Sequence, residues 1–420
     1  MLNTTRLFLA FLYLRIAAAI VDMRFGVSTS PLVSVMTLGF ICLVFLTKAR
    51  LRHVGIGLFW VFVVIAGLGV FSMVAQPMRN PGAASSFVVQ TLLYAGVALG
   101  TAALFRTQQH LRWLYDFCVV YLAIGAFSSV YQIVTRTGLI ERDNQLLRAY
   151  GIGFHPVDYG MIVVILLVLA EVCRRRAGVG VTWTYRAVIL SSLVALYFTQ
   201  ARTAWVMLAL VGVSYVYARS KGIWKVTSVL GVGLGGIWLV FVSGRFEDLT
   251  TLPAFLANTA FDATGYDYRL VDSSMAWRIV NWVMHYHVAW ENPLIGYGPG
   301  QARDVSYFQL EMHNAFLEYF IELGLPGLAT LTVGIVVAWL MHKRIKQNLK
   351  PYRGAYAMVA ALSLSILISM ASSVGFLDQT AATMFMIMLL VVGSVRLVPL
   401  EGEQSSSQLE VSHRPRPALA

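Results

Sequence analysis

The chain has 420 residues, of which 58% are hydrophobic and only 12% are charged, with a mean hydropathy of +0.70. A soluble domain carries about 25% charged residues, so this composition excludes an ordinary soluble protein and indicates a lipid-embedded one. The formal net charge of +12 comes mostly from short segments between apolar runs, which argues against a nucleic-acid-binding function.

Apolar runs of about 20 residues predict membrane-spanning helices. About twelve such runs lie at roughly 7–21, 28–47, 54–75, 86–105, 113–135, 159–173, 186–200, 203–218, 226–244, 326–342, 354–375 and 379–397. Arg15 inside the first run favours a retained helix over a cleaved signal peptide. We expect an all-α integral membrane protein with one domain over 1–400, including a helical loop at about 245–325. The polar tail at 401–420, rich in Ser and Pro, predicts a disordered cytoplasmic segment.

The lysines indicate how the chain is oriented in the membrane. If the first residues lie in the cytoplasm, all six lysines fall on the cytoplasmic side: Lys48, Lys221, Lys225, Lys343, Lys346 and Lys350. This distribution agrees with the positive-inside rule and predicts that both termini are cytoplasmic. The three cysteines lie in apolar runs, and we find no disulfide or metal-ligand spacing, so no metal and no cofactor are expected.

The outer side carries arginines but no lysine. They are Arg24, Arg79, Arg136, Arg142, Arg148, Arg202, Arg245, Arg269, Arg278 and Arg303. The planar guanidinium suits two-point contacts with phosphate oxygens, although each arginine could instead meet a lipid headgroup or a loop carboxylate. Arg202 lies between two apolar runs, where it is either an isolated connector charge or a contact for a lipid-linked phosphate.

The large loop is predicted to contain its own helix, which Ser273 or Ser274 can cap and which ends at Glu291-Asn292-Pro293. Arg278, Asn281 and His285 have i, i+3 and i+7 spacing and therefore share one face. Two interpretations remain open, because this stripe either faces water on an interfacial helix or makes Arg278 an anion contact. Glycines at 296, 298 and 300 follow, and they permit positive φ angles and close backbone approach, as in a phosphate or sugar cradle.

His313-Asn314 precedes a short predicted helix. Residues 315–323 predict two to three helical turns, Gly324 fits the position after a helix end, and Pro326 suits the next first turn. The positive end of a helix disfavours imidazolium, so we expect the pKa of His313 to lie below its reference of about 6.5. A neutral ring is what a general base requires, and a capping or packing histidine is the alternative. His155 is the second candidate.

The pattern His313-Asn314, nine residues, Gly324, two residues and Gly327 resembles the signature of the bacterial lipopolysaccharide O-antigen ligases. O-antigen polymerases and bacterial O-linked oligosaccharyltransferases are relatives of that family. The similarity extends to the number of spans, to the large loop before the histidine and to Gln200-Ala201-Arg202-Thr203.

The resemblance implies a GT-C-type glycosyltransferase of the bacterial inner membrane that acts on the periplasmic face without a metal or a nucleotide sugar. Its donor would be O-antigen polysaccharide on undecaprenyl pyrophosphate, and its acceptor a sugar hydroxyl of the lipid A–core. Arg202 and Arg278 match arginines associated with the donor pyrophosphate, and His313 matches the histidine that activates the acceptor. The resemblance also points to Asp378, the sole acidic residue of the last outer loop, but with a weaker match. Asn314, Arg148 and His155 are supporting candidates from their positions alone.

Two other functions remain as alternatives. An O-antigen polymerase often has two sizeable arginine-rich outer loops, whereas the segment at about 136–158 is modest and offers one chance match, Arg142 to Gly153. A transporter of polyprenyl-linked glycans would carry charges deep in several spans. Here most charges lie near span ends, with Arg15, Asp116 and Glu171 as exceptions.

Overall fold

The computed structural model describes residues 4–25, 30–46, 53–140, 147–153, 155–242, 274–306, 312–371 and 379–394. Asp378, Arg142, the predicted tail at 401–420 and the loop residues 245–273 lie outside the described residues.

Twelve of the described helices coincide with the predicted apolar runs. They are α1 (Thr4–Phe25), α2 (Ser30–Leu46), α3 (His53–Ala75), α4 (Pro81–Leu104), α5 (Gln108–Val134), α6 (Pro156–Arg176), α7 (Trp183–Thr199), α8 (Arg202–Arg219), α9 (Ile223–Val242), α13 (Ala315–Asn348), α14 (Arg353–Met370) and α15 (Gln379–Ser394). The large loop contributes α11 (Ser274–Glu291) and α12 (Ala302–Val305). A short antiparallel hairpin of β1 (Leu139–Ile140) and β2 (Leu147–Arg148) was not predicted, and it leaves the all-α class unchanged.

Side-chain caps define where several of these helices begin. The Asn80 side chain accepts a hydrogen bond from the backbone N–H of Ala83 at 3.0 Å, and a proline follows it at the first helical position. Thr107 and Thr182 cap α5 and α7 in the same way. Such caps satisfy N–H groups that have no partner within the helix, and these three helices begin three to five residues before the predicted apolar runs.

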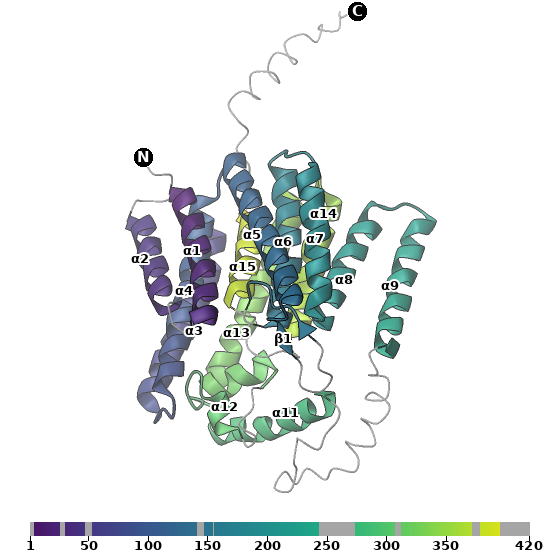
Figure 1. Cartoon of the computed structure of the whole chain (residues 1–420). Helices are drawn as coiled ribbons and strands as arrows, with labels where there is room; N and C mark the ends of the chain where they lie inside the picture. Colours follow the sequence, from purple (N-terminus) through teal and green to yellow (C-terminus); the bar gives the residue numbers. More distant parts are fainter. Residues whose placement is uncertain are drawn as a thin grey trace, which may run out of the picture.

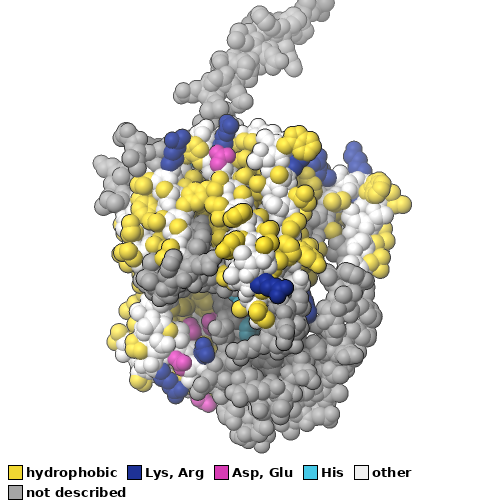
Figure 2. Space-filling model, in the orientation of Figure 1, with side chains coloured by type: hydrophobic (Ala, Val, Ile, Leu, Met, Phe, Trp, Pro, Cys, Tyr) yellow, Lys and Arg dark blue, Asp and Glu magenta, His cyan; other side chains and the backbone are white. Residues whose placement is uncertain are grey.

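The long helices run alternately up and down in one bundle, and α11 and α12 lie below one end of it (Figure 1). We call that end, where α6, α8 and α13 begin, the site end, because His313 directly precedes α13 there. The opposite, basic end is where α4, α6, α8 and α13 finish; Lys and Arg side chains follow its rim, above a mostly hydrophobic surface (Figure 2). Hydrogen bonds join the helix ends there: Arg176 Nη1 donates to the carbonyl of Val391 at 3.2 Å, and Asn348 Nδ2 to that of Val392 at 2.9 Å.

Helix α6 lies at the centre of the bundle. Its residues from Met161 to Leu166 are at most 1% exposed, and α15 beside it is similarly buried from Ile387 to Val392. By contrast, other helices expose large apolar side chains such as Phe127 and Trp339, at 75% and 70%. Exposed apolar helix faces around a packed interior are what a lipid solvent favours.

Length and composition alone identify membrane-crossing helices. Among the described residues, six helices are long and apolar enough to cross a membrane. They are Ile56–Ala75, Pro81–Leu104, Gln108–Val134, Pro156–Arg176, Ala315–Asn348 and Arg353–Met370. Three shorter apolar helices, Thr4–Leu14, Leu32–Cys42 and Ala382–Gly393, add to them. The protein is therefore an all-α, multi-pass membrane protein, and the crossing of all twelve helices stays a prediction.

Candidate active site

His313 lies directly before α13 because Asn314 caps that helix. The Asn314 Oδ1 atom accepts from the backbone N–H groups of Phe316 at 3.1 Å and Leu317 at 3.2 Å. His313 itself has a φ of +51°, a left-handed conformation that non-glycine residues rarely adopt. Such strain persists only where the surroundings hold it, and it often marks a functional position. Asn314 therefore fixes the start of the helix directly after His313.

Gly324 interrupts α13, as the sequence predicted. Its φ of 67° and ψ of −166° are non-helical, so residues 315–323 form a separate short helix before the longer one. The break leaves carbonyls without partners in the helix. Those of Ile321 and Glu322 accept from the N–H groups of Tyr297 at 2.8 Å and Gly298 at 2.9 Å. The nine-residue spacing thus places the carbonyls that hold the 293–298 loop two to three turns after His313.

The three loop glycines pack against protein, not around an open cradle. A Cβ at Gly296 would lie 2.5 Å from the Glu322 carbonyl oxygen, and one at Gly300 would lie 2.9 Å from Ala83 Cβ. A Cβ at Gly298 would collide with the Met78 side chain. All three residues have positive φ angles. The glycines serve close backbone approach, and their interpretation as a phosphate or sugar cradle has no support here.

The connection between α3 and α4 holds the loop around Gln301 through three hydrogen bonds, which together we call the clamp. The Gln301 side chain donates to the Asn80 carbonyl at 2.9 Å and accepts from the Asn80 N–H at 3.0 Å. Arg79 donates to the carbonyl of Asp304 at 2.7 Å, so this outer arginine makes a loop contact. The clamp joins residues more than 200 positions apart, and the sequence pattern contains no signal for it.

Glu322 is a second residue whose structural role the sequence pattern did not predict. It is 3% exposed, and its Oε1 accepts from the N–H of Ala302 at 3.4 Å. This carboxyl attaches α12 to the short helix that follows His313. The available signal was an acidic residue within an otherwise largely apolar helix, a place where a buried partner is expected.

The polar stripe of α11 faces the protein interior. Asn281 and His285 are 0% and 1% exposed, which overturns the interpretation of a water-facing stripe. His285 Nδ1 lies 2.6 Å from the Asn281 carbonyl oxygen, which can only accept, so the proton lies on Nδ1. Burial lowers the pKa of His285. The Trp282 indole N–H donates to the Met312 carbonyl at 2.8 Å and thus fixes α11 beside His313.

Among the described residues, Arg278, one turn before Trp282, and His155 are the charged groups that lower the pKa of His313. The pKa of His313 is lowered to about 4, first by burial, then by the Arg278 guanidinium and then by His155. The direction is the one expected, but the main cause is burial and not the helix dipole. The structure therefore brings together three residues that span more than 150 positions, from His155 to His313. It keeps the imidazole of His313 neutral at pH 7.

His155 also connects this cluster to the start of α8. It caps α6 through Nδ1, which accepts from the N–H of Val157 at 3.2 Å, and its side chain is exposed. The first turns of α6 and α8 are in close contact: a Cβ at Gly160 would lie 2.8 Å from Ala204 Cβ. Only a glycine at this position allows that approach.

Arg202 is the first residue of α8, and its side chain is exposed at the site end. The preceding residue, Ala201, makes no side-chain cap. The positive end of α8 therefore keeps N–H groups that can attract an anion. Arg148 lies nearby, because its Nε donates to the carbonyl of Thr199 at 2.9 Å and holds β2 against the end of α7. That bond makes Arg148 a positioning candidate.

Residues 187–332 match the O-antigen ligase family. The match runs from α7 into α13 and contains Arg202, Arg278, His313 and both motif glycines. It confirms the resemblance inferred from the motif and supports membership of the O-antigen ligase and polymerase superfamily. Among curated proteins, none matches the chain.

Proposed function

We propose that this protein is an O-antigen ligase of GT-C type in the bacterial inner membrane. All twelve long helices cross the bilayer, both termini are cytoplasmic, and the site end faces the periplasm. The enzyme transfers polysaccharide from undecaprenyl pyrophosphate to a sugar hydroxyl of the lipid A–core. The observation that carries this proposal is a neutral, half-buried His313 beside Arg278, inside the family match and at the end opposite the basic rim.

The reaction is a single displacement at the anomeric carbon of the donor. The acceptor hydroxyl gives its proton to the imidazole of His313, and its oxygen forms the new glycosidic bond. The bond between the anomeric carbon and the pyrophosphate oxygen breaks, so the configuration inverts. Arg278 and Arg202 stabilise the negative charge on the departing undecaprenyl pyrophosphate, and this stabilisation requires no metal ion.

The pKa of His313 implies that the donor binds before His313 activates the acceptor hydroxyl. A pKa of about 4 keeps the ring neutral but makes it a weak base. A bound pyrophosphate brings negative charge to Arg278, which offsets the repulsion between the guanidinium and imidazolium. Donor binding therefore raises the pKa of His313 and strengthens the base at the moment when the leaving group is in place.

The test is a reconstitution with purified protein. Lipid-linked glycan and lipid A–core are incubated together with a chelator and without ATP, and the glycan attached to lipid A–core is measured. Joined product supports the ligase. Longer lipid-linked chains with unmodified core would replace this proposal with the polymerase, and movement of glycan between leaflets without a new bond would replace it with the transporter.

A further inference from the structure

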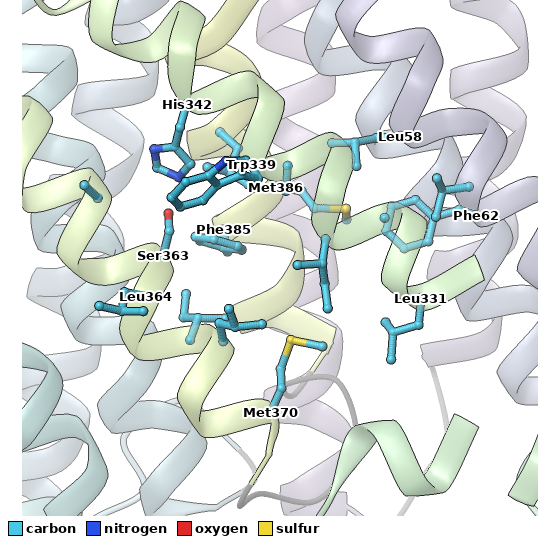
Figure 3. Close-up of a pocket in the computed structure, with 18 of the residues that line it drawn as sticks. Leu58, Phe62, Leu331, Trp339, His342, Ser363, Leu364, Met370, Phe385 and Met386 are labelled. Carbon is cyan, nitrogen blue, oxygen red and sulfur yellow. The ribbon is translucent and has the colours of Figure 1, made fainter. Parts of the chain in front are cut away.

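A cavity of about 420 Å³ lies among α3, α13, α14 and α15, and His313 does not line it (Figure 3). Most of its wall is apolar, as at Phe62, Leu331 and Phe385. Apolar cavities of this kind bind apolar groups, because water gains few hydrogen bonds inside them. The cavity is therefore suited to a hydrocarbon chain.

One end of the cavity is cationic. Lys343 and Lys346 line it in the last turns of α13, and the side chain of His342 lies at that end in the close-up (Figure 3). From Leu331 to Lys346 the helix rises about 22 Å at about 1.5 Å per residue. One leaflet takes up about half of a hydrocarbon core of about 30 Å. The cavity is therefore long enough to hold an acyl chain of one leaflet, with its positive charge at the basic end.

The cavity opens sideways toward the bilayer. Trp339 and Leu364 line it on α13 and α14, and they are 70% and 57% exposed. Lys343 and Lys346 are exposed as well, and no carboxylate among the described residues forms an ion pair with either. A molecule can therefore enter from the lipid and meet two cations that form no ion pair within the described part of the chain.

We propose that this cavity binds an anionic phospholipid from the leaflet at the basic end. Its phosphate lies beside Lys343 and Lys346, and an acyl chain follows the apolar wall. Charge complementarity favours this occupant over the tail of a polyprenyl-linked donor. The proposed reaction keeps the donor pyrophosphate at the site end, and a donor tail would leave both lysines unused. The choice between these two occupants rests on the proposed function, whereas the apolar wall and the two lysines do not.

The test measures retained lipid by native mass spectrometry, with purified protein in mild detergent. Phosphatidylglycerol, phosphatidylcholine and undecaprenyl phosphate are offered in turn. Wild type retains phosphatidylglycerol preferentially. The double variant K343Q/K346Q lowers that affinity about 25-fold, because each lysine near a membrane surface contributes about 1 kcal/mol, or fivefold. Ala360→Phe fills the cavity and lowers retention without changing the charge. Lys350→Gln, at the same end but outside the lining, leaves retention unchanged.

Three results would overturn the proposal. Equal retention of the two phospholipids by wild type removes the role of charge. Unchanged phosphatidylglycerol retention in K343Q/K346Q would show that the two lysines do not bind the headgroup. Preferential retention of undecaprenyl phosphate that Ala360→Phe abolishes assigns the cavity to a polyprenyl tail. If Ala360→Phe misfolds, as size-exclusion chromatography reports, the lysine variant decides alone, because both lysines are exposed and their replacement leaves the core intact.

Discussion

At the scale of single residues, His313 combines a strained backbone with a depressed pKa. Its motif and its place before a helix were readable in the sequence, because Asn314 and Gly324 mark the two ends of the short helix. Its burial was not readable. That burial depends on α11, whose Trp282 reaches the Met312 carbonyl from 30 positions away. The sequence therefore predicted the direction of the pKa shift but not its main cause.

Replacing the base should abolish transfer and leave folding intact. We expect His313→Ala to lower the transfer rate by about 10²–10⁴-fold, the range that general base catalysis contributes. The measurement is the rate of glycan attachment to lipid A–core at equal protein levels. His287→Ala is the matched control, since His287 is an exposed histidine on α11. Wild-type rates in His313→Ala would remove this residue from the mechanism.

The charge on Arg278 should be visible in the pH profile. Neutral His313 is the active form, so activity is lost as the pH falls through its pKa. For the free enzyme, the acid limb of kcat/KM should lie at about 4, and the limb of kcat should lie higher because bound donor offsets Arg278. Arg278→Gln removes a positive neighbour, so it should move the kcat/KM limb upward and also slow transfer. Arg278→Lys should keep the limb nearer its wild-type position; identical limbs in all three proteins would contradict the coupling.

At the scale of elements, the break in α13 explains why the 293–300 loop is rich in glycine. The start of the short helix after Asn314 and the break at Gly324 followed from local chemistry, and the structure confirms both. The surface against which the loop packs could not be predicted, because a positive-φ glycine fits a ligand cradle and a close backbone contact equally well. The α11 stripe was ambiguous for a similar reason. Periodicity shows that Asn281 and His285 share a face, but it does not show whether that face meets water or protein.

Gly324→Ala should destabilise the site end. The conformation at Gly324 is one that essentially only glycine adopts, with a cost of about 1–3 kcal/mol for other residues. The added Cβ would lie 2.7 Å from the Leu294 carbonyl oxygen, against backbone that cannot move aside cheaply. We expect a lower unfolding temperature and slower transfer, measured in the same detergent. Gly212→Ala on α8 is the control, because a Cβ there meets nothing within 4 Å. Equal unfolding temperatures for the two variants would show that the break is not constrained by the loop.

At the scale of the whole molecule, charge asymmetry predicts the topology of the bundle. The positive-inside rule places the basic end in the cytoplasm and hence α11, α12 and His313 in the periplasm. Thiol labelling in intact cells tests this in a Cys42→Ser background, since Cys42 is an exposed native cysteine whereas Cys118 and Cys173 are buried. Leu294→Cys, at an exposed position of the site end, should react with a membrane-impermeant maleimide without permeabilisation. Lys221→Cys, between α8 and α9, should react only after permeabilisation. The reverse pattern would place the candidate site in the cytoplasm, where a periplasmic transfer to lipid A–core is impossible.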